Sequence, residues 1–154
     1  AYIQHLVGSR VERVFARTAS HFHQANFDND VDDLATVTLE MENGVVATLC
    51  IGRIGAASHP DIGEIKLHVL GETGGLVISE ARPEVSVYYR DQAPQEFRHR
   101  RMAIDLDYQL MEDFSRAIDA GSGGILDAVT SREIAATVQA AVDSGKSGRV
   151  ETVA

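Results

Sequence analysis

Hydrophobic and polar residues alternate along several short segments in the first two-thirds of the chain. This period of two is typical of β-strands. It predicts strands at residues 10–19, 33–41, 45–51, 64–70, 76–78 and 85–89. Asn43-Gly44 separates two of these runs and predicts a hairpin in which both turn residues adopt positive φ, and the glycine-rich residues 71–75 predict a further turn. Strands that follow one another through tight turns predict an antiparallel sheet.

The last third of the chain changes to helical spacing. Its apolar side chains recur on one stripe: Leu106, Leu110, Phe114, Ala117 and Ile118. This stripe predicts a helix at residues 106–120 that Gly121 ends. Thr130 and Glu133 have the spacing of a capping box and predict a second helix, which ends at Gly145.

Two short segments complete the pattern. Residues 1–8 have helical spacing and end at Gly8, where a glycine is favoured after a helix. Because so short a helix is marginal in water, we expect it to begin upstream of Ala1. Residues 149–153 predict a last strand.

Strands followed by helices predict an α+β fold, in which an open, mainly antiparallel sheet carries helices on one face. Several strands are apolar on both faces, with Leu39 beside Val37 and Ile78 beside Val77. Two helices and one short helical segment cannot cover both faces. We therefore expect the other face to form an oligomer interface, in a homodimer or a tetramer, or to pack on another domain.

Composition narrows the class of protein. The chain has 154 residues, which predicts one domain over residues 1–154. Its net charge of −9 argues against a nucleic-acid partner. Cys50 is the single cysteine, so there is no internal disulfide framework. No apolar run approaches the ~18 residues of a membrane span, and no leader pattern opens the chain, so we expect a cytoplasmic protein.

His21 and His23 form a His-x-His pair at the end of the first predicted strand, with four aspartates close behind. This arrangement puts two imidazoles on one side of a strand and suits zinc or iron. A loop that faces the substrate is favoured over a metal site, and the alternative interpretation is a solvated polar loop that happens to hold two histidines. The pattern assigns no metal ligand.

A second group of polar residues follows the second strand of the hairpin. Arg53 offers directional donors for a carboxylate or a hydroxyl-rich ligand, and Asp61 offers an acceptor for sugar hydroxyls. His59 lies between them. An ordinary exposed loop is the alternative interpretation.

No motif supplies a complete active site. Residues 121–124 are rich in glycine, but they follow a predicted helix, and position 126 is Leu where G-x-G-x-x-G requires Gly. The chain also contains no G-x-S-x-G elbow. From the residues alone we assign no catalytic and no cofactor-binding position.

The order of segments resembles the C-terminal domain of the Gfo/Idh/MocA oxidoreductases, a family of sugar and cyclitol dehydrogenases. The matching segments are residues 6–8, 32–37, 42–47, 69–76, 140–145 and 148–150. The resemblance implies a large open antiparallel sheet whose free face makes the oligomer interface. It also implies an N-terminal Rossmann domain that binds NAD or NADP and is missing from this chain.

The resemblance reaches few individual positions. The Asp-x-x-x-His of the family falls before Ala1, so no catalytic residue is assigned here. Arg53 stands where similar sequences often carry Arg, and His59 and Asp61 fall on the loop that approaches the sugar in relatives.

Three hypotheses follow. The first is the substrate-binding and oligomerisation domain of an NAD(P)-dependent oxidoreductase, which acts on a sugar or cyclitol hydroxyl by hydride transfer and is inactive as the isolated chain. The second is a standalone oligomerising module that binds a small polar ligand. The third is a metal-dependent enzyme built on His21 and His23.

Overall fold

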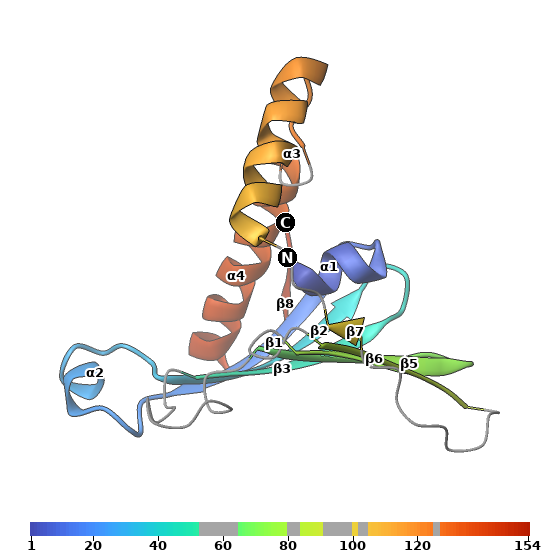
Figure 1. Ribbon diagram of the computed structural model, residues 1–154. Helices are drawn as coiled ribbons and strands as arrows, with labels where there is room; N and C mark the ends of the chain where they lie inside the picture. The colour runs from blue at the N-terminus through green and yellow to red at the C-terminus, as the bar shows by residue number, and fades with distance from the viewer. Residues whose placement is uncertain (53–64, 80–83, 91–99, 102–104, 125–126) are drawn as a thin grey trace. The chain divides into compact units, whose positions relative to one another are not determined.

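The strands of the chain are divided between two compact units. Figure 1 shows the computed structural model, in which the first unit holds residues 1–54 and 110–154 and the second holds residues 55–109. The structure describes residues 1–52, 65–79, 84–90, 100–101, 105–124 and 127–154. Each unit has its own four-stranded antiparallel sheet, which confirms an α+β fold with open antiparallel sheets.

The first unit contains the sheet β3-β2-β1-β8, in which neighbouring strands are antiparallel. Its strands are β1 (Val11–Ala19), β2 (Leu34–Met41), β3 (Val46–Gly52) and β8 (Glu151–Thr152). These bounds confirm the strands predicted at the same places. β1 is central, because β2 pairs along its whole length on one side and β8 pairs with Arg13 and Val14 on the other.

The predicted hairpin between β2 and β3 is confirmed, but its turn differs from the expectation. The Met41 carbonyl accepts from the Gly44 N–H at 2.9 Å, and the Met41 N–H donates to the Val45 carbonyl at 2.9 Å. The loop therefore has three residues, and only Gly44 has positive φ, at 85°. The prediction of positive φ at Asn43 was wrong, because a three-residue loop places the left-handed position on its last residue.

Helices α1 (Tyr2–Val7) and α4 (Ala128–Ser147) lie on the same face of this sheet (Figure 1). They enclose a hydrophobic core: Val11, Val14, Ala16, Val37, Leu39, Met41 and Ala140. Val37 and Leu39 both belong to this core, since residues two apart in a strand share a face. In this sheet they are therefore no sign of a second apolar face.

Small residues let α4 approach β1 closely. Ser144 is completely buried, and its Oγ accepts from the Ala16 N–H at 2.8 Å and donates to the Arg149 carbonyl at 2.5 Å. A Cβ on Gly145 would lie 3.1 Å from the Thr18 side chain. The predicted end of the helix at Gly145 was wrong, because the close contact keeps this glycine inside a helix that continues to Ser147.

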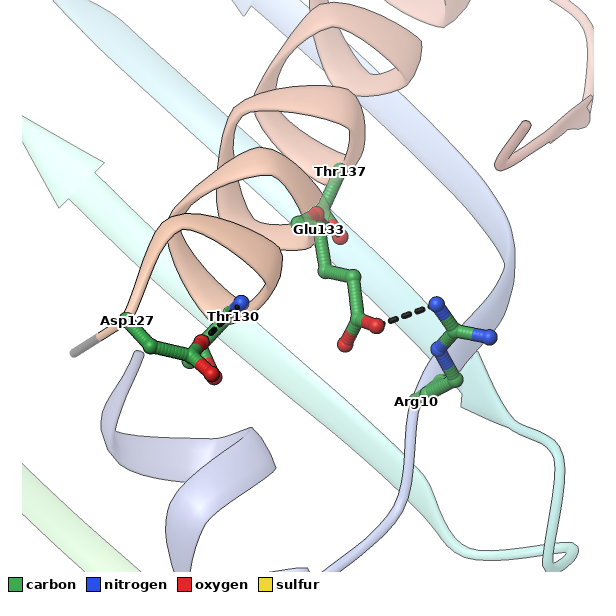
Figure 2. Close-up of polar contacts among 5 residues, drawn as sticks. All are labelled: Arg10, Asp127, Thr130, Glu133 and Thr137. Carbon is green, nitrogen blue, oxygen red and sulfur yellow. Dashed lines mark hydrogen bonds and ion pairs between the residues drawn. The ribbon is translucent and has the colours of Figure 1, made fainter. Parts of the chain in front are cut away.

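The start of α4 also differs from the prediction. Asp127 is its N-cap and accepts from the Thr130 N–H at 2.7 Å (Figure 2). That hydrogen bond from the Thr130 backbone is the main cause that lowers the pKa of Asp127. Glu133, the expected capping-box partner, instead forms an ion pair with Arg10. The helix therefore begins at Ala128, before the predicted cap.

The predicted helix at residues 106–120 is confirmed as α3 (Leu106–Ala120), and Gly121 follows it with a φ of 61°. Among the described residues, no helix is long and apolar enough to cross a membrane.

The second unit contains the sheet β4-β5-β6-β7, also antiparallel. Its strands are β4 (Lys66–Leu70), β5 (Gly74–Ser79), β6 (Glu84–Tyr89) and β7 (Arg100–Arg101). Gly74 and Gly75, expected in the turn, are the first residues of β5. A Cβ on Gly74 would lie 2.2 Å from the Tyr88 carbonyl oxygen, so the lack of a side chain at Gly74 permits the close approach of β5 and β6.

Removal of the Ser144 hydroxyl tests the contact between α4 and β1. Ser144→Ala leaves the buried Ala16 N–H without its acceptor and is expected to lower the free energy of unfolding by about 1–3 kcal/mol. Urea unfolding of this variant is compared with that of Ser115→Ala, which changes an exposed serine of α3. Equal stability of the two variants would contradict this role of the hydroxyl.

Candidate functional site

Three strands have an end at the same side of the first sheet. Ala19, the last residue of β1, pairs with Leu34, the first residue of β2. Leu34 also pairs with Gly52, the last residue of β3. The turn at residues 20–23 and the short helix α2 (Gln24–Asp28) therefore leave the sheet where β3 ends.

Asp33 holds this turn together. Its side chain accepts three backbone N–H groups, from His21 at 3.0 Å, from Phe22 at 2.8 Å and from His23 at 3.1 Å. The residue is only 4% exposed. Its own N–H donates to the Ala19 carbonyl at 3.1 Å, so Asp33 joins the turn to the end of β1.

The same contacts decide the charge of the Asp33 carboxyl. Burial, the largest single influence, favours the neutral acid and raises the pKa of this group. The three N–H donors, helped by the His23 ring, together outweigh burial and lower the pKa of Asp33 below its ordinary value of 3.8. The side chain is therefore an ionised carboxylate at neutral pH.

The turn presents both predicted histidines to solvent. His21 and His23 are exposed, and the His21 ring meets the Phe22 ring edge-on at 6.3 Å. In the part of the chain that the structure describes, no three His, Cys, Asp or Glu side chains are grouped to hold a metal ion. The Asp33 oxygens are taken up by backbone donors, so this carboxylate is a positioning group for the turn.

The other three predicted site residues, Arg53, His59 and Asp61, lie outside the described residues. Sequence reasoning counted Asp33 only as one member of an acidic run. The available signal was the position of Asp33 directly before Leu34, the first residue of β2. This position brings one carboxylate of the acidic run next to the sheet.

A cleft at the opposite end of β1 was not predicted. It has a volume of about 680 Å³ and lies between α1 and the first turns of α4. Tyr2 and His5 line it from α1, and Thr130 and Ile134 line it from α4.

An ion pair forms part of the wall of this cleft. Arg10, just before β1, reaches the Glu133 carboxylate of α4 (Figure 2). The hydrogen bond to Glu133 is the main cause that raises the pKa of Arg10. The spacing from Thr130 assigned Glu133 to the helix cap. No other feature of the sequence indicated its ion pair with Arg10.

The glycine-rich residues 121–124 do not fit a dinucleotide phosphate. A Cβ on Gly123 would lie 2.3 Å from the Asp127 Cβ, and one on Gly124 would lie 3.2 Å from an Asp113 carboxylate oxygen. Two acidic side chains therefore border the loop, and a phosphate would meet negative charge there. The loop is a helix stop that leads to the cap of α4.

Comparison with known proteins identifies the family. Residues 1–77, half of the chain, match the family described as the GFO/IDH/MocA C-terminal domain. The chain belongs to this family. No curated protein sequence matches it.

Solved structures share the fold. An oxidoreductase from Agrobacterium radiobacter in complex with NAD+, L-tartaric acid and magnesium matches 99% of this chain, with a TM-score of 0.76 and 16% identity. Aldose-aldose oxidoreductase from Caulobacter crescentus, complexed with glycerol, matches 97%, with a TM-score of 0.75 and 16% identity. Levoglucosan dehydrogenase in complex with NADH matches 94%, with a TM-score of 0.78 and 20% identity.

These relatives are longer than the present chain. The match covers 46% of the Agrobacterium protein, 43% of the Caulobacter protein and 45% of levoglucosan dehydrogenase. At these identities the likeness establishes the fold alone.

The lowered pKa of Asp33 predicts how stability depends on pH. Because the folded-state pKa lies below 3.8, the carboxylate contributes its full stabilisation above that pH. The contribution is lost as the pH falls from 3.8 through the folded-state pKa. Asp33→Asn is therefore expected to lower stability most at neutral pH, with a difference from the parent chain that shrinks in acid.

Urea unfolding at about pH 7 and about pH 3 measures this difference. Asp32→Asn, which changes the exposed neighbour, is the control. A stability difference for Asp33→Asn that is the same at both pH values would contradict the role of the ionised carboxylate.

Proposed function

We propose that this chain is the substrate-binding and oligomerisation domain of a longer NAD(P)-dependent oxidoreductase that acts on a sugar or cyclitol hydroxyl by hydride transfer. The observation that carries the proposal is membership of the GFO/IDH/MocA C-terminal domain family. The fold shared with aldose-aldose oxidoreductase and levoglucosan dehydrogenase supports the substrate class.

The proposed substrate site is the end of the first sheet where the turn at residues 20–23 leaves β1. Asp33 fixes the backbone of this turn, so His21 and His23 are held on an ordered support. Arg53, His59 and Asp61, which come after β3 in the sequence and lie outside the described residues, are proposed as further substrate-binding residues. Imidazole, guanidinium and carboxylate groups together provide donors and acceptors for several hydroxyls.

The proposed nucleotide site lies outside this chain. The loop at residues 121–124 is bordered by carboxylates, and the sequence has no other candidate for a phosphate loop. We therefore assign nicotinamide binding to the part of the longer relatives that the present chain does not match. The isolated chain is accordingly proposed to be inactive.

The proposed oligomer interface is the aliphatic face of the second sheet. Strand pairing places six aliphatic residues together on this face: Leu67, Val69, Leu76, Ile78, Val85 and Val87. The described residues of this unit contain no complete helix that would cover them. An aliphatic surface of this kind is stabilised by burial, and a second copy offers the same surface.

The functional proposal is tested by the gene and by cofactor binding. The sequence upstream of the Ala1 codon is expected to encode a βαβ unit with G-x-G-x-x-G. The protein that includes it should reduce NAD or NADP with a sugar or cyclitol, followed as nicotinamide absorbance. Calorimetric titration of the 154-residue chain alone should show no tight binding of either nucleotide.

Tight nucleotide binding by the isolated chain would overturn the assignment of the cofactor. An upstream region without a dinucleotide fold would favour the standalone binding module. In the longer enzyme, His21→Ala and His23→Ala should raise KM by roughly tenfold each. His68→Ala, which changes an exposed histidine of β4, should leave KM unchanged.

The oligomer proposal is tested with two valine variants. Light scattering of the parent chain is expected to give a mass of at least two chains. Val87→Glu places a charge on the aliphatic face and should give a single chain, because burial of an unpaired carboxylate is costly. Val46→Glu, on the exposed edge of β3, should leave the mass unchanged, and circular dichroism confirms folding. A parent chain of one-chain mass would refute the interface.

A further inference from the structure

The turn between β2 and β3 contains Asn43 and Gly44, and both residues are exposed. An asparagine that precedes a glycine is open to a reaction within the chain, because the glycine has no side chain to shield its nitrogen. Asn43 is the one asparagine of the sequence that precedes a glycine, since Asn26 and Asn29 both precede residues that carry side chains. This turn is therefore a candidate site of covalent modification.

The reaction joins the Gly44 backbone to the Asn43 side chain. The Gly44 N–H loses its proton, and its nitrogen attacks the Asn43 Cγ. The new C–N bond closes a succinimide ring, and the bond from Cγ to the side-chain nitrogen breaks, so that this nitrogen leaves with the proton as ammonia. Water then opens the ring at either carbonyl carbon. One opening leaves aspartate, and the other leaves isoaspartate, in which the backbone runs through the former side chain.

The folded turn restrains the attacking nitrogen. The Gly44 N–H donates to the Met41 carbonyl at 2.9 Å, and the Met41 N–H donates to the Val45 carbonyl at 2.9 Å. The first hydrogen bond stabilises the protonated amide, so it opposes the loss of the proton with which the reaction begins. The peptide between Asn43 and Gly44 must also rotate before the ring can close, and both hydrogen bonds resist that rotation.

The turn restrains the group under attack as well. The Asn43 Oδ1 accepts from the Val45 N–H at 3.3 Å, which ties the side chain to the backbone beyond Gly44. The Glu42 N–H donates to the Arg10 carbonyl at 3.0 Å, so the first residue of the loop is also held. Ring closure therefore requires a local opening of the hairpin, in which these contacts are lost together.

We propose that Asn43 is a site of spontaneous deamidation that the folded β2–β3 turn suppresses, so that a modified Asn43 records an opening of this hairpin. The two products differ in their effect on the fold. Aspartate keeps the loop length and can still accept from the Val45 N–H. Isoaspartate lengthens the backbone of a loop whose length fixes the register of β2 and β3, so the hairpin cannot close as before. The inference does not depend on the proposed function of the domain.

Comparison of deamidation rates tests the proposal. The native chain, the chain in guanidinium chloride and a synthetic peptide of residues 39–47 are incubated at the same mildly alkaline pH. Trypsin then releases residues 18–53 from the chain as one peptide that contains all three asparagines, so fragment masses assign each amide-to-acid conversion to its residue. Asn43 should react at least about tenfold more slowly in the native chain than in the other two samples, because its hydrogen bonds must open first.

Matched glycine variants identify the attacking nitrogen. In guanidinium chloride, Gly44→Ala should slow the reaction of Asn43, because a side chain then shields that nitrogen. Gly8→Ala, which changes another glycine of positive φ, should leave the rate at Asn43 unchanged under the same conditions. Both rates are measured without the fold, so the comparison does not require either variant to be stable.

A third comparison separates the added charge from the altered backbone. Asn43→Asp has the charge of the product on a normal backbone and should unfold at a urea concentration close to that of the parent chain. The chain that carries isoaspartate, isolated by reversed-phase chromatography and refolded, should unfold at a lower urea concentration.

Four results would overturn the proposal. The first is an equal rate at Asn43 in the native chain and in the peptide, which would show that the turn gives no protection. The second is no reaction at Asn43 in guanidinium chloride. The third is an equal rate for Gly44→Ala and Gly8→Ala. The fourth is an isoaspartate chain as stable as Asn43→Asp, which would show that the hairpin tolerates the longer loop.

Discussion

The rest of the first unit depends on the contact between α4 and the middle of β1. The edge of β1 beyond Val14 has no partner in β8, so the Ala16 N–H needs another acceptor. The Ser144 hydroxyl of α4 is this acceptor. The same hydroxyl donates a hydrogen bond to the carbonyl of Arg149, where the chain turns back towards β8. One buried hydroxyl thus joins the helix, the central strand and the segment that leads to the last strand. Because a buried N–H without a partner is costly, the helix has one favourable register on the sheet.

With its middle fixed in this way, β1 supports a polar arrangement at each end. At the far end the Asp33 carboxylate gathers three N–H groups of the turn, and at the near end Glu133 holds Arg10 against α4. The two carboxylates act differently. Asp33 is buried, so its hydrogen bonds stabilise the folded turn. The Arg10–Glu133 pair is only partly buried, with the Arg10 side chain half-exposed, and an ion pair near the surface contributes little to stability. Its effect is to set the direction of two side chains at the wall of a cleft.

Local patterns were sufficient for most elements and insufficient for their precise ends. Alternation located β1 and β2, because it reflects one buried face of each strand. Helical spacing located α3, although Leu110, Phe114 and Ile118 of its apolar stripe are exposed. Gly145 and Glu133 were misassigned for a shared reason. A glycine that permits a close contact with Thr18 has the same sequence signature as a helix stop, and a glutamate paired with Arg10 has that of a cap. The role of Asp33 was also out of reach, since its partners lie ten to twelve residues away. Spacing cannot report contacts between elements that only the fold brings together.

Several acidic residues of the chain have structural roles. Asp127 caps α4, Asp33 binds the turn, and Asp113 and Asp127 border the glycine-rich loop. The Asp127 and Asp33 carboxylates accept backbone N–H groups that would otherwise attract an anion. The loop that most resembles a phosphate site is bordered by the negative charge of Asp113 and Asp127. A phosphorylated ligand is therefore disfavoured at the α4 cap and at this loop, whereas a neutral hydroxyl-rich ring meets no such penalty. The arrangement of charge thus supports a division of labour. Under the proposed function, this division leaves the nucleotide phosphates to a part of the longer relatives that the present chain does not match.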